Sequence, residues 1–145
     1  MVMPLEAKVT NGNGVIPIGS GSPLSEDRHP VRRISVIIPA FNEELAVAET
    51  VIELRKLFEG TDIKAEIIIV DDGSKDATAH EAKAAGARVI QHKNNRGYGA
   101  SLKTGILAAA NDIIAITDAD GTYPAKYLPK MLDELEHADM IVGSR

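Results

Sequence analysis

Two aspartates separated by one residue, Asp118 and Asp120, have the type and spacing that suit a metal ion. They follow an apolar run, and residues two apart in extended chain point the same way, so both carboxylates can reach one locus. A divalent cation would relieve their mutual repulsion. Because the chain has no cysteine and no histidine close by, these oxygen ligands suit Mg²⁺ or Mn²⁺, which keeps positions open for substrate phosphates. The alternative interpretation is an ordinary acidic turn.

A second acidic pair, Asp71 and Asp72, closes another apolar run and opens a helical segment. One aspartate, or Ser74, is enough to cap that helix. A carboxylate at the end of a strand can also accept hydrogen bonds from a ribose hydroxyl or a base N–H. We expect Asp72 to have this binding role and Asp71 to be structural.

The loop at 94–99, with the sequence NNRGYG, precedes a further helical segment. Free backbone N–H groups and the helix dipole favour anions at such a position. The loop is neither a Walker loop nor a complete G-x-G-x-x-G fingerprint, since Gly105 comes too late. Arg96 fits two roles, contact with a diphosphate or closure of the loop. The four histidines show no ligand spacing and are interpreted as surface or rim residues: His29, His80, His92 and His137.

Short apolar runs alternate with segments whose apolar residues have helical spacing. These strands and helices would position the acidic residues and the loop at 94–99. The runs are mostly β-branched, which is typical of buried strands, and they cover 34–38, 65–70, 88–91, 113–117 and 140–142. Apolar residues at helical spacing predict helices around 47–58, 79–85, 102–109 and 128–135. Strands joined by helices run parallel with right-handed crossovers. The expected fold class is therefore α/β, a doubly wound, mostly parallel sheet with helices on both faces.

Cap residues and strand-end loops agree with this fold. Asn42 is expected to cap the first helix, Ser74 or Asp76 to cap the second, and Gly86 to end the second in a left-handed conformation. The loops after all five runs are polar and would share one edge of the sheet. Ligands bind at that edge, outside the carboxyl ends of the strands, where the strand order reverses. We therefore expect four side chains to surround one cleft: Phe41, Asp72, Asp118 and Asp120.

Length and composition limit the domains and the partners. A chain of 145 residues with a net charge of −5 fits one globular domain and argues against nucleic acid as a partner. Residues 1–31, rich in Gly, Asn, Ser and Pro, predict a disordered tail before a single domain at 32–145. The lack of an apolar run of about 20 residues and of a signal peptide predicts a cytoplasmic protein. A basic cluster could touch anionic lipid headgroups, which allows peripheral membrane contact, but simple solvation is the preferred interpretation of these residues: Arg28, His29, Arg32 and Arg33.

Five motifs occur in order with fitting gaps between Ile34 and Arg145. They are VIIPAFNEE at 36–44, IIVDDGS at 68–74, NRGYGA at 95–100, DADG at 118–121 and VGSR at 142–145. Together they resemble family 2 glycosyltransferases of the GT-A fold, and most closely the dolichyl-phosphate mannosyltransferase-like, or polyprenyl-phosphate, branch. The resemblance implies a Rossmann-like domain that binds a nucleoside-diphosphate sugar. It implies metal-dependent, inverting transfer to a polyprenyl or dolichyl phosphate acceptor, at the cytoplasmic membrane surface. The alternative is a hydroxyl acceptor, which would need a carboxylate base from the acceptor-binding half, and these residues do not decide between the two.

The resemblance also implies roles for single residues. Asp120 would bind the Mg²⁺ or Mn²⁺ that bridges the donor diphosphate and would be the catalytic residue. Arg145 would help to hold the acceptor phosphate. Thr122 stands where some relatives supply a glutamine ligand, and a neutral hydroxyl is a weaker one. Six residues would form the nucleotide site: Pro39, Phe41, Glu43, Asp72, Asp118 and Ala119.

The family continues beyond the last motif with strands and helices that form the acceptor site. We therefore expect this chain to be the truncated N-terminal, donor-binding half, with an incomplete sheet edge that favours self-association. The alternative is a non-catalytic nucleotide-binding or assembly fragment that has lost the acceptor half. A response-regulator receiver is disfavoured, because its aspartate pair would follow the first strand and a lysine would follow the fifth.

Overall fold

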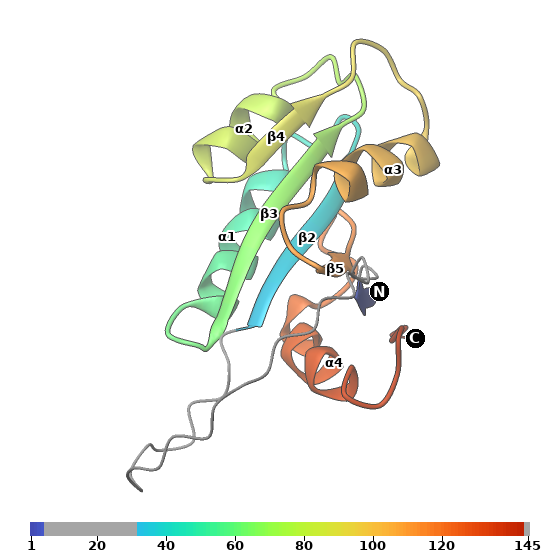
Figure 1. Ribbon diagram of the computed structural model, residues 1–145. Helices are drawn as coiled ribbons and strands as arrows, with labels where there is room; N and C mark the ends of the chain where they lie inside the picture. The colour runs from blue at the N-terminus through green and yellow to red at the C-terminus, as the bar shows by residue number, and fades with distance from the viewer. Residues whose placement is uncertain (5–31, 144–145) are drawn as a thin grey trace, which may run out of the picture.

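A five-stranded sheet runs through the computed structural model, which describes residues 1–4 and 32–143 (Figure 1). The strand order is β1-β5-β2-β3-β4. Four strands are parallel and β1 is antiparallel to β5. The strands are β1 (Val2–Pro4), β2 (Arg32–Ala40), β3 (Ile63–Asp71), β4 (Arg88–Gln91) and β5 (Ile113–Ile116). The strands expected around 34–38, 65–70, 88–91 and 113–117 are thus confirmed.

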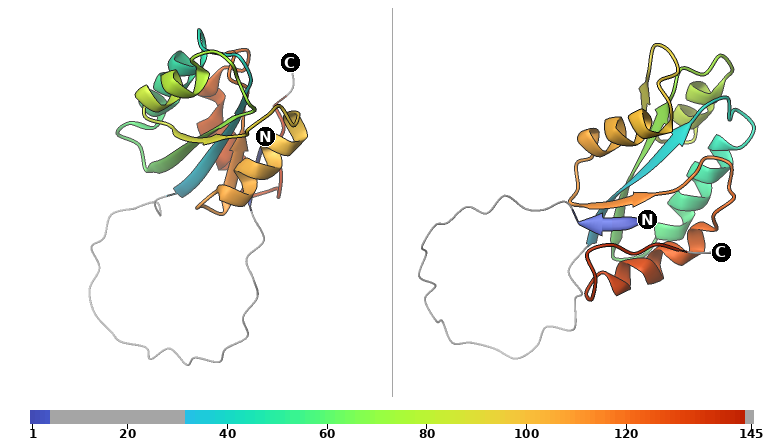
Figure 2. Two further views of the ribbon diagram at one scale, coloured as in Figure 1. Left: turned by 90° about the horizontal axis from the view of Figure 1, so that it is seen from above. Right: turned by 90° about the vertical axis from the view of Figure 1, so that its right-hand side faces the viewer.

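Helices cover both faces of the sheet, as expected for a doubly wound fold. They are α1 (Val47–Phe58), α2 (Thr78–Ala84), α3 (Tyr98–Ala108) and α4 (Leu128–Glu134), the last preceded by a 3-10 turn, η1 (Ala125–Tyr127). Side chains of α1, α2 and α4 join one apolar cluster, whereas α3 packs on a second cluster across the sheet. Figures 1 and 2 show α3 on the opposite side of the sheet from α1 and α2.

The alternation of side chains along β2 and β3 supplies both clusters. Val36 and Ile38 face the helices α1 and α4, while Ile37 faces α3. Both strands are therefore buried on both sides, which is why they read as continuous apolar runs. Gly105 of α3 lies where an added Cβ would be 2.4 Å from Cγ2 of Ile37. The missing side chain lets α3 pack closely on the sheet.

The strand order reverses between β2 and β5. The chain moves from β2 to β3 to β4 on one side, then crosses through α3 to β5 on the other side of β2. In open α/β sheets such a reversal creates a crevice at the carboxyl ends of the two strands. Phe41 follows β2 and Asp118 follows β5, so both lie at this reversal.

The edge of the sheet differs from the sequence prediction. Residues 140–142 do not form a strand, and Ile141 makes only an isolated bridge. The edge of β5 is paired by β1 instead, where the Ile116 amide donates to the Met1 carbonyl at 2.7 Å. The first residues of the predicted tail thus belong to the sheet, because they satisfy backbone groups that β5 would otherwise leave unpaired. Residues 5–31 of that tail, with Arg28 and His29, lie outside the described residues.

The helix ends confirm the predicted role of Gly86 and correct the predicted N-caps of α1 and α2. Gly86 has φ 94°, the expected left-handed conformation after α2. Asn42 does not cap α1, because that helix starts after Ala46 without a side-chain cap. The cap position of α2 is Ala77, not the predicted Ser74 or Asp76, although Asp76, one residue earlier, accepts a hydrogen bond from the Thr78 amide at 3.0 Å. Across residues 1–4 and 32–143, no helix is both long and apolar enough to cross a membrane.

Candidate functional site

The loops that follow β2 and β3 are joined into one unit. Asn42, in a left-handed conformation with φ 55°, donates its amide to Ser74 Oγ at 2.8 Å and accepts from the Lys75 amide at 3.0 Å. The Glu43 amide donates to Thr78 Oγ1 at 2.8 Å. Phe41 stands at the tip of this unit with 45% of its surface exposed. The bonds therefore fix the backbone around an aromatic ring that is accessible to a ligand.

Asp71 is a structural residue. Its side chain accepts from the Ser74 amide at 3.0 Å and from Nε2 of Gln91 at 3.0 Å. Both bonds close the turn after β3 and tie it to the end of β4. Because Asp71 is 1% exposed, it has no surface to offer a ligand.

Asp72 is 4% exposed and is held by three donors. Its carboxylate accepts from the Arg96 amide at 2.9 Å, the Gly97 amide at 2.7 Å and Nδ1 of His92 at 2.6 Å. Burial alone would raise the pKa of Asp72, but the bonds from these three donors bring that pKa below its ordinary value. A carboxylate has about four acceptor positions. Asp72 therefore has room for at most about one further hydrogen bond to a ligand.

Two amides of the anion site predicted at the start of α3 are already used within the chain. Gly97 has φ 91°, which turns its amide and that of Arg96 toward Asp72. Those two N–H groups therefore bind a carboxylate of the chain itself rather than a phosphate. The Arg96 side chain is exposed. The physical reason for the correction is that the Asp72 carboxylate lies within reach of the loop in the folded chain, which the linear order does not reveal.

The prediction for His92 is wrong. This residue is 9% exposed rather than a surface or rim residue, and its Nε2 lies 2.9 Å from Oγ1 of Thr104 on α3. The signal that it is part of the site was available, because His92 directly follows the run at 88–91, at the same edge as the other strand-end residues. The absence of metal-ligand spacing says nothing about His92, because its ring nitrogens contact Asp72 and Thr104 rather than a metal ion.

The segment 118–120 follows β5 and is anchored at its centre. Ala119 is 3% exposed, and its carbonyl accepts from Thr50 Oγ1 of α1 at 2.8 Å. The flanking aspartates are more accessible, Asp118 half-buried and Asp120 exposed. Asp120 accepts from the Thr122 amide at 2.9 Å, which shapes the following turn. The anchored alanine thus presents two carboxylates at the reversal of the strand order.

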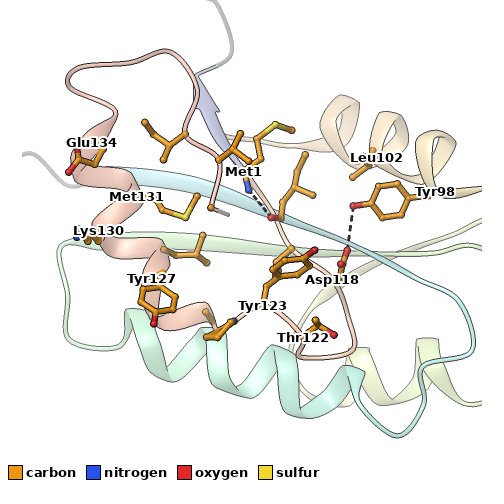
Figure 3. Close-up of a pocket in the computed structure, with 18 residues that line it drawn as sticks. Met1, Tyr98, Leu102, Asp118, Thr122, Tyr123, Tyr127, Lys130, Met131 and Glu134 are labelled. Atoms are coloured by element: carbon orange, nitrogen blue, oxygen red, sulfur yellow. Dashed lines mark hydrogen bonds between the residues drawn. The ribbon is translucent and has the colours of Figure 1, made fainter. Parts of the chain in front are cut away.

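A cavity of about 1170 Å³ opens beside Asp118 (Figure 3). Tyr98 and Asp118 point toward one another at its edge, and the tyrosine hydroxyl donates to Oδ1 at 3.4 Å. Burial, followed by the Asp118 charge, raises the pKa of Tyr98. The Met1 ammonium group donates to the Ile116 carbonyl at 3.1 Å in the same cavity. The remaining lining is largely apolar and aromatic: Leu102, Tyr123, Tyr127, Met131 and Val142 among others.

The four side chains expected around one cleft are only partly brought together. Asp118 lines this cavity, whereas Phe41, Asp72 and Asp120 do not. All four nevertheless follow the carboxyl ends of β2, β3 and β5, three strands that are hydrogen-bonded side by side. Arg145, expected at the acceptor phosphate, lies outside the described residues.

Asp118 and Asp120 are the candidate ligands for a cation. Among the described residues, no group of three or more His, Cys, Asp or Glu side chains is arranged to hold a metal ion. Mg²⁺ is commonly held by one or two carboxylates together with substrate phosphates and waters, rather than by a complete protein cage. Two accessible carboxylates at the end of β5 therefore fit that kind of cation.

Two known proteins with similar sequences are a transferase of Haloferax volcanii and a protein of Methanocaldococcus jannaschii. The chain is 36% identical over 113 residues to the dolichyl-phosphate hexose transferase of Haloferax volcanii, covering 77% of this chain and 47% of that protein. It is 43% identical over 117 residues to an uncharacterised protein of Methanocaldococcus jannaschii, covering 77% of this chain and 46% of that protein. The chain spans about half the length of these curated relatives.

A solved structure with the same fold is the glucosyl-3-phosphoglycerate synthase of Mycobacterium tuberculosis. It matches with a TM-score of 0.63 and 28% identity over 74% of this chain and 42% of that one. Crystals of that enzyme contain Mn²⁺, UDP-glucose and phosphoglyceric acid, or Mg²⁺ and UDP. Residues 35–145 match the family described as glycosyl transferase family 2. The chain, with its mostly parallel, doubly wound sheet, therefore belongs to glycosyltransferase family 2.

Proposed function

We propose that this chain binds a nucleoside-diphosphate sugar and a divalent cation at the carboxyl ends of β2, β3 and β5. In the whole protein, the bound sugar is transferred with inversion to a polyprenyl or dolichyl phosphate. The observation that carries the proposal is the anchored segment Asp118-Ala119-Asp120 at the reversal of the strand order. The names of the relatives, a dolichyl-phosphate hexose transferase and a synthase crystallised with UDP-glucose, support it.

The nucleoside is proposed to lie against the end of β2. The exposed ring of Phe41 offers an apolar surface for a base, next to Pro39 and Glu43. Asp72 contributes mainly by holding the neighbouring loop, since three of its acceptor positions are used within the chain. Asp118 and Ala119 border the ribose from the end of β5.

The cation is proposed to bind Asp120 and Asp118. When bound, it would neutralise the charge that develops on the leaving diphosphate. The chain's own contribution is to hold the two carboxylates in place, through the bond from Thr50 to Ala119 and the turn closed by the Thr122 amide.

A lipid phosphate acceptor needs no general base. The second pKa of a phosphate monoester is about 6, so its oxygen is already largely ionised at neutral pH. That oxygen attacks the anomeric carbon in line with the departing nucleoside diphosphate, which inverts the configuration at that carbon. Arg145 is proposed to help hold the acceptor phosphate. Contact with the membrane surface follows from a lipid acceptor and is part of the same proposal.

Calorimetric titration with UDP and GDP, with and without Mn²⁺, tests donor binding. We expect Mn²⁺ to tighten nucleotide binding to the chain, and Asp120→Asn to remove that tightening while the fold is retained. Asp112→Asn is the matched control, because Asp112 is an exposed aspartate at the opposite end of β5. Equal metal dependence in the wild type and in Asp120→Asn would refute the assignment of Asp120.

A further inference from the structure

His92 is a buried ionisable residue to which the proposed function assigns no role. Its two ring nitrogens contact groups on two other elements, Asp72 after β3 at 2.6 Å and Thr104 on α3 at 2.9 Å. The residue itself follows β4. One imidazole thus connects the ends of two neighbouring strands to the helix that crosses to β5.

The chemistry of the partners orients the ring. An ionised aspartate only accepts hydrogen bonds, so Nδ1 of His92 is the donor to Asp72. Nε2 of a neutral ring accepts from the Thr104 hydroxyl, while that of a charged ring donates to it. In both forms each nitrogen has a partner and the ring is fixed in one orientation.

The contacts of His92 lead, through Asp72 and the loop before α3, to Asp118, one of the proposed cation ligands. The Asp72 carboxylate that His92 holds also accepts from the amides of Arg96 and Gly97. Gly97 is the residue that precedes α3, and Tyr98, the first residue of that helix, reaches Asp118. A continuous series of contacts therefore runs from Thr104 through His92 and Asp72 to the edge of the cavity beside Asp118.

We propose that His92 is a positioning residue for the donor site, which holds Asp72 and through it the loop that places Tyr98 beside Asp118. The proposal rests on the proposed function, because it takes the donor to bind at this end of the sheet. His92 itself touches no substrate. Its effect is on the geometry of the groups that do.

A second polar network provides a control for purely structural effects. Ser35 is fully buried in β2, donates to Glu66 at 2.9 Å and accepts from Nδ2 of Asn111 at 3.1 Å. It therefore resembles His92 in burial and in the number of side chains it joins. Asn111 precedes β5, however, so this network lies toward the amino ends of the strands, away from the site.

The experiment compares nucleotide affinity in three variants of the full chain. His92→Leu removes both ring bonds, His92→Asn keeps a donor near the Nδ1 position, and Ser35→Ala is the control. UDP with Mn²⁺ is the probe, titrated by calorimetry at a temperature where every variant is folded. Loss of a supporting residue typically weakens a metal or catalytic site by about tenfold or more, and we expect a loss of that size for His92→Leu. His92→Asn should recover most of it, and Ser35→Ala should change the affinity less than about twofold.

The geometry of the loop is measured separately in the absence of nucleotide. Amide hydrogen exchange at Arg96 and Gly97 should accelerate in His92→Leu and stay unchanged in Ser35→Ala. If the wild type binds neither UDP nor GDP, the proposed function fails, while this exchange measurement still tests the role of His92. Should His92→Leu not fold, Thr104→Val removes only the second contact and should give the same changes at smaller amplitude.

Two results would overturn the inference. One is unchanged exchange at Arg96 and Gly97 in a folded His92→Leu chain. The other is an affinity loss in Ser35→Ala equal to that in His92→Leu, which would mean that any weakened polar network has the same effect.

Discussion

Gly73 allows the loop after β3 to lie directly against the loop after β4. A Cβ at this position would be 2.7 Å from the carbonyl carbon of Asn94 and 2.8 Å from the amide nitrogen of Asn95. Both neighbours are backbone atoms, so no side-chain rotation can relieve the clash. Gly73 also has φ 77°, a left-handed conformation that favours glycine. We therefore expect Gly73→Ala to separate two loops of the candidate site.

Gly60 provides the matched control for this substitution. Its φ of 75° is nearly the same, but a Cβ there would meet nothing within 4 Å. Alanine in the left-handed conformation costs about 1–2 kcal/mol at either position. Forcing an extra carbon into a filled space adds typically about 1–3 kcal/mol, and this addition applies only at Gly73.

Urea denaturation of the two variants measures the difference. Gly60→Ala should lower the free energy of unfolding by the conformational cost alone, and Gly73→Ala should lower it further by about 1–3 kcal/mol. Gly73→Ala should also weaken UDP binding, since the displaced loop carries the amides that hold Asp72. Equal losses of stability in the two variants would show that the loops are not in the close contact described.

Two further predictions concern stability. The lowered pKa of Asp72 means that its carboxylate stabilises the fold above the ordinary aspartate pKa of about 4, and that this stabilisation is lost as the pH falls through the lowered value. Asp72→Asn should therefore lower the free energy of unfolding by about 1.5–3 kcal/mol at pH 7. Its urea midpoint should also fall less between pH 5 and pH 2 than that of the wild type. Parallel pH profiles of the two proteins would contradict this prediction. Gly105→Ala should destabilise the chain by about 1–3 kcal/mol through the contact with Ile37, although alanine is the better helix former, and a raised melting temperature would refute it.

Much of the fold could be predicted because local and long-range signals agree. The strands at 34–38 and 65–70 are buried on both faces, so their sequences are continuous β-branched runs. The helix from Val47 to Phe58 packs on the sheet with one face, so its apolar residues have helical spacing. The edge of the sheet was less predictable. The edge of β5 can pair with any extended segment that reaches it, and the apolar residues at 140–142 gave no sign that β1 pairs there instead.

The candidate site was predictable in its location but not in its internal contacts. The topology rule places strand-end residues at one edge, and Phe41, Asp72, Asp118 and Asp120 all lie at the carboxyl ends of their strands. Which polar groups bond with each other depends on distances between loops that are far apart in the chain. Asp72 and Gly97 are separated by 25 residues, and no periodicity or spacing connects them.

The contacts of Asp72 bear directly on how this edge of the sheet could receive a diphosphate. In many nucleotide-binding folds, amides at a helix start stabilise the phosphates. Here the amides of Arg96 and Gly97 donate to Asp72, so the negative charge that they stabilise belongs to the chain. The same edge carries Asp118 and Asp120, whose charges repel an approaching diphosphate. A cation bound by those two aspartates would reverse that repulsion at the point where the phosphates arrive. The occupied loop amides are therefore a physical reason, independent of the relatives, to expect that Mn²⁺ tightens the binding of UDP and that the effect depends on Asp120.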